Sequence, residues 1–142
     1  MLLENLKLNN VKNVRAFNLG IAKDEGVKRL YFAPKSFHKA SLIPDKSKPL
    51  SLTIRTIPLQ SVIEDNRLER IDFLKMDCEG AEYEILLNTP LEILRSINKM
   101  SIECHCHPTY SIKDLKVFLE KIGFRVYVKT KMLYAKKISL QQ

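Results

Sequence analysis

The period of apolar and polar positions changes several times along the chain, and one stretch carries two periods in succession. A mostly apolar run from Ile71 to Met76 has the length of a buried strand. The run breaks at Asp77-Cys78-Glu79-Gly80, after which the apolar spacing of a helix begins. Because ligands of α/β proteins bind where strands end and helices begin, this junction is the first candidate for a functional site. Three carboxylates crowd it: Asp77, Glu79 and Glu82.

The other periodic stretches predict strands and helices on both sides of this junction. Strands are expected over residues 14–20, 27–32, 52–57, 99–105, 124–129 and 132–138, with the last two forming an antiparallel hairpin. Helices are expected from residue 2 to a stop at 9–10, over 59–65, from the junction to 88, over 90–96 with Pro90 as the first helical residue, and over 112–122. Thr89 to Glu92 and Ser111 to Asp114 have the spacing of capping boxes. Residues 33–50 contain three prolines and predict an irregular loop.

Strands that alternate with helices predict an α/β fold with a mainly parallel sheet, and the C-terminal antiparallel hairpin forms its mixed edge. The 142 residues are enough for a single domain over 1–142 that buries a core of its own. No internal repeat or linker divides the chain.

Composition and charge narrow the class of protein. The 45% of hydrophobic residues fits a globular protein, and the apolar runs are too short to span a bilayer, so no membrane partner is expected. Three cysteines, an odd number, favour a reducing cytoplasm, and the N-terminus lacks the pattern of a signal peptide. A net charge of +8 could attract an anionic partner, but the basic residues are spread over the whole chain, which disfavours nucleic-acid binding.

Lys75 and Asp77 share one face of the central strand, because side chains alternate between the two faces. An unpaired ammonium group is costly to bury, so we expect Lys75 to be buried and to contact Asp77. This pair is either a structural ion pair at a sheet edge or a pair in which Lys75 orients Asp77 at a ligand site. Glu79 and Glu82 follow, and acids in the first turn stabilise any helix through its dipole. Gly80 is less easily explained in this way, and it predicts a tight turn or a close approach of the backbone.

A second cluster of polar residues lies in Ile102-Glu103-Cys104-His105-Cys106-His107. Alternation places the acid and both histidines on one face and both cysteines on the other, which argues against zinc. We expect Glu103 and His105 to reach the edge of the sheet beside Asp77. Such a cluster suits proton removal or a hard cation such as Mg²⁺ held by Asp77 and Glu103. His107 is expected to be a residue of a surface loop.

The stretch Ile71-Asp72-Phe73-Leu74-Lys75-Met76-Asp77-Cys78-Glu79-Gly80-Ala81-Glu82 resembles the signature of the FkbM-type methyltransferases. The resemblance extends from about Leu6 to His105, including a Glu-x-His strand end at Glu103 and His105. It implies a Rossmann-like class I methyltransferase that uses S-adenosylmethionine, with O-methyl transfer to a hydroxyl of a small molecule or glycan. By position, Asp77 and His105 are the catalytic candidates and Glu79 and Glu103 the supporting acids.

The resemblance also implies a cofactor site in which Gly20, Ile21 and Ala22 hold the adenine end and Asp77 lies at the reacting end. Family members begin with a strand and a glycine-rich turn that this sequence lacks: it has four glycines and no Gly-x-Gly. We therefore expect the chain to correspond to the C-terminal part of the domain, truncated at its N-terminus. Open sheet edges would then favour self-association. A degenerate, non-catalytic binding module and a basic nucleic-acid-binding domain are the alternatives.

Overall fold

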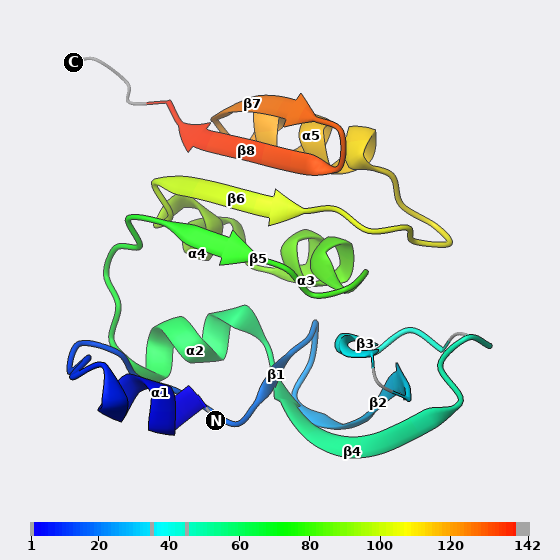
Figure 1. Ribbon diagram of the computed structural model, residues 1–142. Helices are drawn as coiled ribbons and strands as arrows, with labels where there is room; N and C mark the ends of the chain where they lie inside the picture. Colours follow the sequence, from blue (N-terminus) through cyan, green and yellow to red (C-terminus); the bar gives the residue numbers. More distant parts are fainter. Residues whose placement is uncertain (1, 35, 45, 139–142) are drawn as a thin grey trace.

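The computed structural model describes residues 2–34, 36–44 and 46–138 (Figure 1). The helices are α1 (Leu2–Leu8), α2 (Leu59–Asp65), α3 (Glu82–Asn88), α4 (Leu91–Arg95) and α5 (Ile112–Lys121). The strands are β1 (Gly20–Ile21), β2 (Gly26–Ala33), β3 (Ser36–Ser41), β4 (Leu50–Ile57), β5 (Leu74–Met76), β6 (Lys99–Glu103), β7 (Phe124–Lys129) and β8 (Met132–Lys137).

The strands form two four-stranded sheets, ordered β1-β4-β2-β3 and β5-β6-β8-β7. Parallel pairing joins β1 to β4 and β5 to β6, whereas the other pairings are antiparallel. The fold is a mixed α/β fold, and the prediction of a mainly parallel sheet is wrong. The connection from β7 to β8 explains part of the difference, because it is a tight turn that is too short for the crossover that parallel strands require.

Several predicted elements are confirmed by the structure. Helix α2 has the predicted bounds, and β7 and β8 form the expected antiparallel hairpin. The capping box of α5 is present: the Ser111 hydroxyl accepts a hydrogen bond from the backbone N–H of Asp114, whose carboxylate accepts one from the backbone N–H of Ser111. After this helix, Gly123 adopts a φ of +101°, which favours glycine and ends the helical run.

Other predicted elements are wrong. Residues 14–19 form no strand, and Val14 and Phe17 are exposed, because only Gly20–Ile21 pair with β4. The predicted irregular loop over 33–50 contains β3, which pairs with β2 across a bulge. The hydroxyl of Thr89 donates to the carbonyl of Ile85 and so closes α3 instead of capping α4, which begins after Pro90 without a side-chain cap.

One face of the sheet β5-β6-β8-β7 carries the core. Helices α4 and α5 lie behind this sheet in the view of Figure 1. Ile102 of β6, Leu133 of β8 and Leu119 of α5 are fully buried in the same cluster as Leu86 of α3. Burying such side chains contributes roughly 1.5–3 kcal/mol each, so this cluster holds the ends of β5 and β6 in place.

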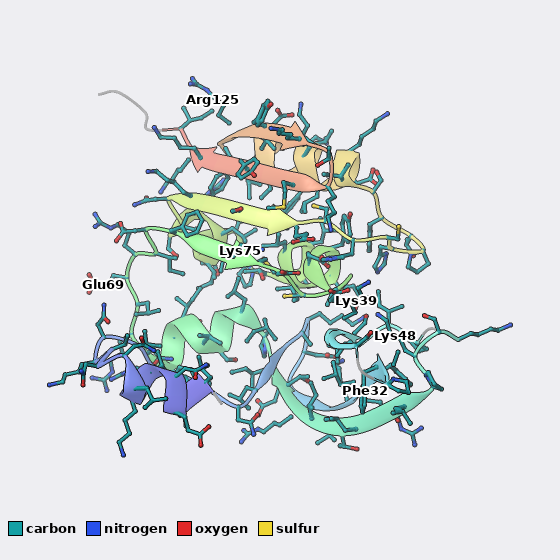
Figure 2. The ribbon with its side chains drawn as sticks, viewed as in Figure 1. Phe32, Lys39, Lys48, Glu69, Lys75 and Arg125 are labelled. Carbon is teal, nitrogen blue, oxygen red and sulfur yellow. The ribbon has the colours of Figure 1, made fainter. Side chains whose placement is uncertain are left out.

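The opposite face of this sheet is polar and aromatic. Lys75, Ser101, Tyr134 and Tyr127 are aligned across the four strands, and the two tyrosine rings stack with their centroids 6.3 Å apart. Figure 2 marks Lys75 on β5, the edge of this sheet that faces the other sheet, and Arg125 on β7. The strand alternation predicted around Lys75 is therefore confirmed, since Met76 is buried while Lys75 is exposed.

Each sheet ends in strands that pair on one side, β1 and β3 in one sheet and β5 and β7 in the other. Such edges present free backbone groups to a further strand. Self-association through these edges stays a prediction. Among the described residues, no helix is long and apolar enough to cross a membrane.

Candidate functional site

His105 and Glu82 form the centre of the candidate site. Glu82, the first residue of α3, is fully buried, and its Oε1 lies 2.5 Å from Nδ1 of His105. The same oxygen accepts a hydrogen bond from the backbone N–H of His105 at 3.3 Å. Because a carboxylate is an acceptor, Nδ1 carries the imidazole proton in this pair, and the lone pair of a neutral ring is then on Nε2. Glu82 thus fixes both the orientation and the tautomer of His105.

The free nitrogen of His105 faces three further carboxylates. Nε2 lies 3.8 Å from Oδ1 of Asp77, 3.8 Å from Oε1 of Glu79 and 3.7 Å from Oε1 of Glu103. These separations are longer than hydrogen bonds, so space for another atom remains between the groups. The imidazole therefore connects a buried carboxylate on one side to a partly exposed acidic cluster on the other.

The sheet places the acids of this cluster. Asp77 directly follows β5, and Glu103 is the last residue of β6, which runs parallel to β5. Each of Asp77, Glu103 and His105 offers one possible ligand atom, and these three atoms lie within 4.8 Å of one another. The prediction that Asp77 and Glu103 meet at the carboxyl ends of adjacent parallel strands is confirmed. The prediction that His105 lies beside them is confirmed as well.

Glu79 reaches the cluster through a turn with an unusual backbone. Its φ is +49°, and Gly80 follows with a φ of +108°, a conformation that L side chains rarely adopt. The hydroxyl of Ser41 donates to the carbonyl of Glu79 at 2.7 Å and holds the turn. A left-handed non-glycine residue costs free energy, and such residues concentrate at functional sites. The turn that Gly80 predicted is confirmed.

Two lysines compensate part of the negative charge. Nζ of Lys75 lies 3.6 Å from Oδ2 of Asp77, so the predicted contact is confirmed. The predicted burial is wrong, because 46% of the Lys75 side chain is exposed and its ammonium group reaches solvent. Lys131, in the turn between β7 and β8, forms an ion pair with Glu103. This partner lowers the pKa of Glu103 and, in return, Glu103 raises the pKa of Lys131.

An aromatic group borders His105. The hydroxyl of Tyr83 donates to the backbone carbonyl of His105 at 3.1 Å, and burial raises the pKa of this phenol. The rings of Tyr83, His107 and Tyr110 contact one another. The His107 centroid lies 5.4 Å from that of Tyr83 and 5.0 Å from that of Tyr110, and the two tyrosine centroids are 6.2 Å apart. His107 lies in the loop after β6, as predicted, and its ring is partly buried in this group. A cavity of about 360 Å³ runs from these rings past His105 to Lys131.

The residues expected at the adenine end lie in and after β1. Ala22 is buried and lines a second cavity of about 340 Å³ together with Lys23, Ile43, Gly80 and Glu84. Ile21 lines a third cavity, of about 400 Å³, on another side of β1. Gly20 lies against the side chains of Ile54 and Thr56. The structure thus brings Ala22 near the turn that carries Glu79, whereas Gly20 and Ile21 pack against β4 and its surroundings.

The sequence analysis did not predict the roles of three residues of the site: Glu82, Tyr83 and Lys131. The sequence shows Glu82 as one of three acids at the junction. Its burial is a result of the packing of α3 against the residues that follow β6, which the sequence does not reveal. The helical spacing after Gly80 directs Tyr83 inward, which is a usable signal. Lys131 lies in a hairpin turn and became part of the site through strand register, for which the sequence offers no signal.

We expect the three cysteines to differ in reactivity. Burial raises the pKa of the Cys78 thiol to about 11 and that of Cys104 to about 11, with Glu82 adding to both shifts, whereas Cys106 is exposed. A thiol of that pKa has about one thiolate in a thousand at about pH 8, and the thiolate is the nucleophile. Iodoacetamide should therefore modify Cys106 first, which peptide mass mapping would show. Equal rates at Cys78 or Cys104 would contradict this geometry.

Comparison with known proteins identifies the family of this chain. Residues 2–126 match the Methyltransferase FkbM domain, and the chain therefore belongs to the FkbM methyltransferase family. It is also similar to "Methyltransferase 1" of Beauveria bassiana (strain ARSEF 2860), with 24% identity over 143 residues. That alignment covers 87% of this chain and 57% of the relative, so the chain spans little more than half the length of this curated relative. No solved structure matches the chain significantly.

Proposed function

We propose that this chain supports transfer of a methyl group from S-adenosylmethionine to a hydroxyl of a small molecule or glycan. The observation that carries the proposal is the Glu82–His105 pair, whose free Nε2 faces three carboxylates at the ends of β5 and β6. In an FkbM methyltransferase domain, this is a place where an acceptor can lose its proton. The parallel β5 and β6, joined through α3 and α4, support the Rossmann-like architecture that the resemblance implies.

The described residues fit part of the cofactor. The cavity beside Ala22 and Gly80, of about 340 Å³, lies at the low end of the sizes that hold small ligands. Ala22 and Ile43 offer apolar contact there, and Lys23 and Glu84 offer polar groups. A glycine-rich turn for the methionine part is absent from the sequence. The residues present thus suit the adenosine end and the reacting end of the cofactor.

When bound, S-adenosylmethionine supplies an electrophilic methyl group: the carbon–sulfur bond breaks as the acceptor oxygen forms a bond to the methyl carbon. The task of this chain is to hold the acceptor oxygen in line and to take up its proton. Nε2 of His105 and the carboxylates of Asp77 and Glu79 that face it can accept this proton. Glu82 stabilises the charged imidazole that results, as a buried carboxylate does for a histidine base.

The acceptor fits the cavity of about 360 Å³ that borders His105. Tyr110, which is partly exposed, supplies aromatic surface, and Lys131 supplies a hydrogen-bond donor at the far side. Flat aromatic surface with polar groups at its edge suits a sugar ring, which has apolar C–H faces and hydroxyls on its rim. This lining supports a glycan or a similar polyhydroxyl compound as the acceptor.

The test is a methyl-transfer assay with S-adenosylmethionine labelled in its methyl group. The purified chain is incubated with a high concentration of donor and a panel of monosaccharides, oligosaccharides and simple phenols, and labelled products are identified by mass spectrometry. We expect label in a methyl ether of a sugar. Absence of any labelled product across the panel, with a folded chain, would count against the proposed function.

A binding module is the second candidate, and the polar face of the sheet β5-β6-β8-β7 favours it. Tyr127 and Tyr134 are 63% and 41% exposed there, and Phe73 on the chain before β5 is 58% exposed. Exposed aromatic side chains of this kind mark contact surfaces. This candidate predicts no methyl transfer, so the same assay separates the two functions.

We expect the affinity of this chain for S-adenosylmethionine to be weak, with a Kd of about 1 mM, which corresponds to a binding free energy of about −4 kcal/mol. The chain presents groups for two parts of the cofactor, and each missing hydrogen bond costs about 1 kcal/mol, more for charged groups. Isothermal titration calorimetry at high donor concentration measures this. A micromolar Kd would contradict the expectation and would require a fuller cofactor site in the described residues, with the segment around β3 the first place to look.

A further inference from the structure

We propose that Asp77, Glu103 and His105 bind one first-row divalent cation of the Mn²⁺ class, with Glu82 positioning the imidazole ligand. The three side chains each offer a ligand atom, and these atoms lie within 4.8 Å of one another. They come from the ends of two hydrogen-bonded strands, which are rigid supports for a metal site. The inference rests on the same centre as the proposed function and adds a cation to it.

The distances in the cluster suit a shared cation better than direct contact. Nε2 of His105 is 3.8 Å from Oδ1 of Asp77 and 3.7 Å from Oε1 of Glu103, beyond hydrogen-bond length. Ligand atoms that share one cation at about 2.1 Å lie about 3–4 Å from each other. A cation therefore fits between these atoms with small side-chain movements.

Charge provides a second argument. Four carboxylates surround the imidazole: Asp77, Glu79, Glu82 and Glu103. Two ammonium groups pair with them, those of Lys75 and Lys131, and both lysines are partly exposed. The cluster thus has two more carboxylates than ammonium groups. A divalent cation would compensate this excess, and it would do so where the carboxylate oxygens converge.

The buried Glu82 is the independent observation. It is fully buried, one of its oxygens contacts Nδ1 of His105, and the other, Oε2, has no hydrogen-bond partner among the described residues. Burying a carboxylate costs free energy unless the carboxylate is paired with a charge and hydrogen-bonded. Histidines that bind metals commonly donate their second N–H to such a carboxylate, which fixes the ring and makes Nε2 a stronger ligand. The Glu82–His105 pair has this arrangement, with Nε2 directed at the acidic cluster.

The donor set selects the class of cation. Mg²⁺ and Ca²⁺ prefer oxygen ligands alone, whereas one imidazole nitrogen with two carboxylates suits Mn²⁺, Fe²⁺, Co²⁺ or Zn²⁺. This refines the prediction of Mg²⁺ at Asp77 and Glu103, because His105 joins them as a ligand. In methyl transfer, the cation would bind the acceptor hydroxyl and lower its pKa. Nε2 is then a ligand, and Glu79, whose Oε1 also faces this point, is the group that takes up the proton.

The experiment is a titration of the metal-stripped chain with Mn²⁺, followed by electron paramagnetic resonance of the free ion and by calorimetry. Neither donor nor acceptor is present, so cation binding and methyl transfer can fail separately. We expect one Mn²⁺ per chain. His105→Ala and Asp77→Asn should each weaken binding by about tenfold or more, and Glu82→Gln by about tenfold, the range found when a residue behind a metal ligand is changed.

His107→Ala is the matched control, because it removes a histidine two residues away that faces Tyr83 and Tyr110 instead of the acidic cluster. Its Mn²⁺ affinity should equal that of the unchanged chain, and circular dichroism should show all variants folded. Absence of stoichiometric Mn²⁺ binding would overturn the proposal. Equal binding by His105→Ala and the unchanged chain, or equal losses in His105→Ala and His107→Ala, would overturn it as well.

Discussion

Replacing His105 with alanine should lower the rate of methyl transfer by about 100-fold or more, the usual contribution of a general acid–base or ligand group. The variant removes the only imidazole that contacts Glu82 in the described residues and leaves that buried carboxylate with the backbone N–H of residue 105 as its remaining donor there. It also removes the nitrogen that faces Asp77, Glu79 and Glu103. The loss should appear in kcat, since His105 acts on the reacting oxygen and not on the remote parts of either substrate.

Glu120→Gln is the control for this prediction. Glu120 lies near the exposed end of α5 and pairs with Lys116, on a surface outside the site. This variant should transfer methyl groups at the rate of the unchanged chain. Added imidazole should restore part of the activity of His105→Ala, because the cavity beside residue 105 can admit a small ring. Full activity in His105→Ala would remove this residue from the mechanism.

Replacing Leu119 with alanine should lower the free energy of unfolding by about 2–5 kcal/mol, the cost of removing a large buried side chain and leaving a cavity. Leu119 has no exposed surface and packs in the cluster with Ile102 and Leu133, under the strands that end at the site. For a chain of this length, about 3 kcal/mol corresponds to a fall of roughly 10 °C in Tm. Differential scanning calorimetry measures both quantities.

Val117→Ala is the matched change on the same helix, since 48% of Val117 is exposed. It should change the free energy of unfolding by about 0.5 kcal/mol or less, as surface substitutions usually do. If Leu119→Ala were as stable as Val117→Ala, the packing of α5 against the sheet would be wrong. The placement of Lys131, which lies on the hairpin that α5 covers, would then also be wrong.

The predictions for His105→Ala and Leu119→Ala concern the site and the core, and the sequence predicts some elements of both and not others. Strong local signals gave the correct elements: the alternation around Lys75, the Ser111 cap and the two runs of the C-terminal hairpin. Strand ends were also predictable, because parallel neighbours bring Asp77 and Glu103 to one edge. The direction of strand pairing was not predictable. Strand β2 pairs directly with β4, and the chain between them forms β3 inside a proline-containing segment that resembles a loop.

The sequence predicts the site residues that lie at strand ends, but it does not predict those that tertiary packing brings into the site. Asp77, Glu79, Glu103 and His105 meet as expected, because each lies at or just after a strand end. The buried position of Glu82 was not visible, because an acid in the first turn of a helix is ordinarily a surface residue that stabilises the dipole. Long-range packing turned this ordinary acid into the partner of His105.

The most direct test of the central claim, that donor and acceptor meet at the His105 centre, is a titration with S-adenosylmethionine observed by ¹H–¹⁵N nuclear magnetic resonance. The method suits weak binding and reports each backbone amide. We predict chemical-shift changes at Ala22, Gly80 and His105, which line or border the two cavities next to α3. Unchanged signals at these residues, or changes confined to the face that carries Tyr127 and Tyr134, would contradict the account.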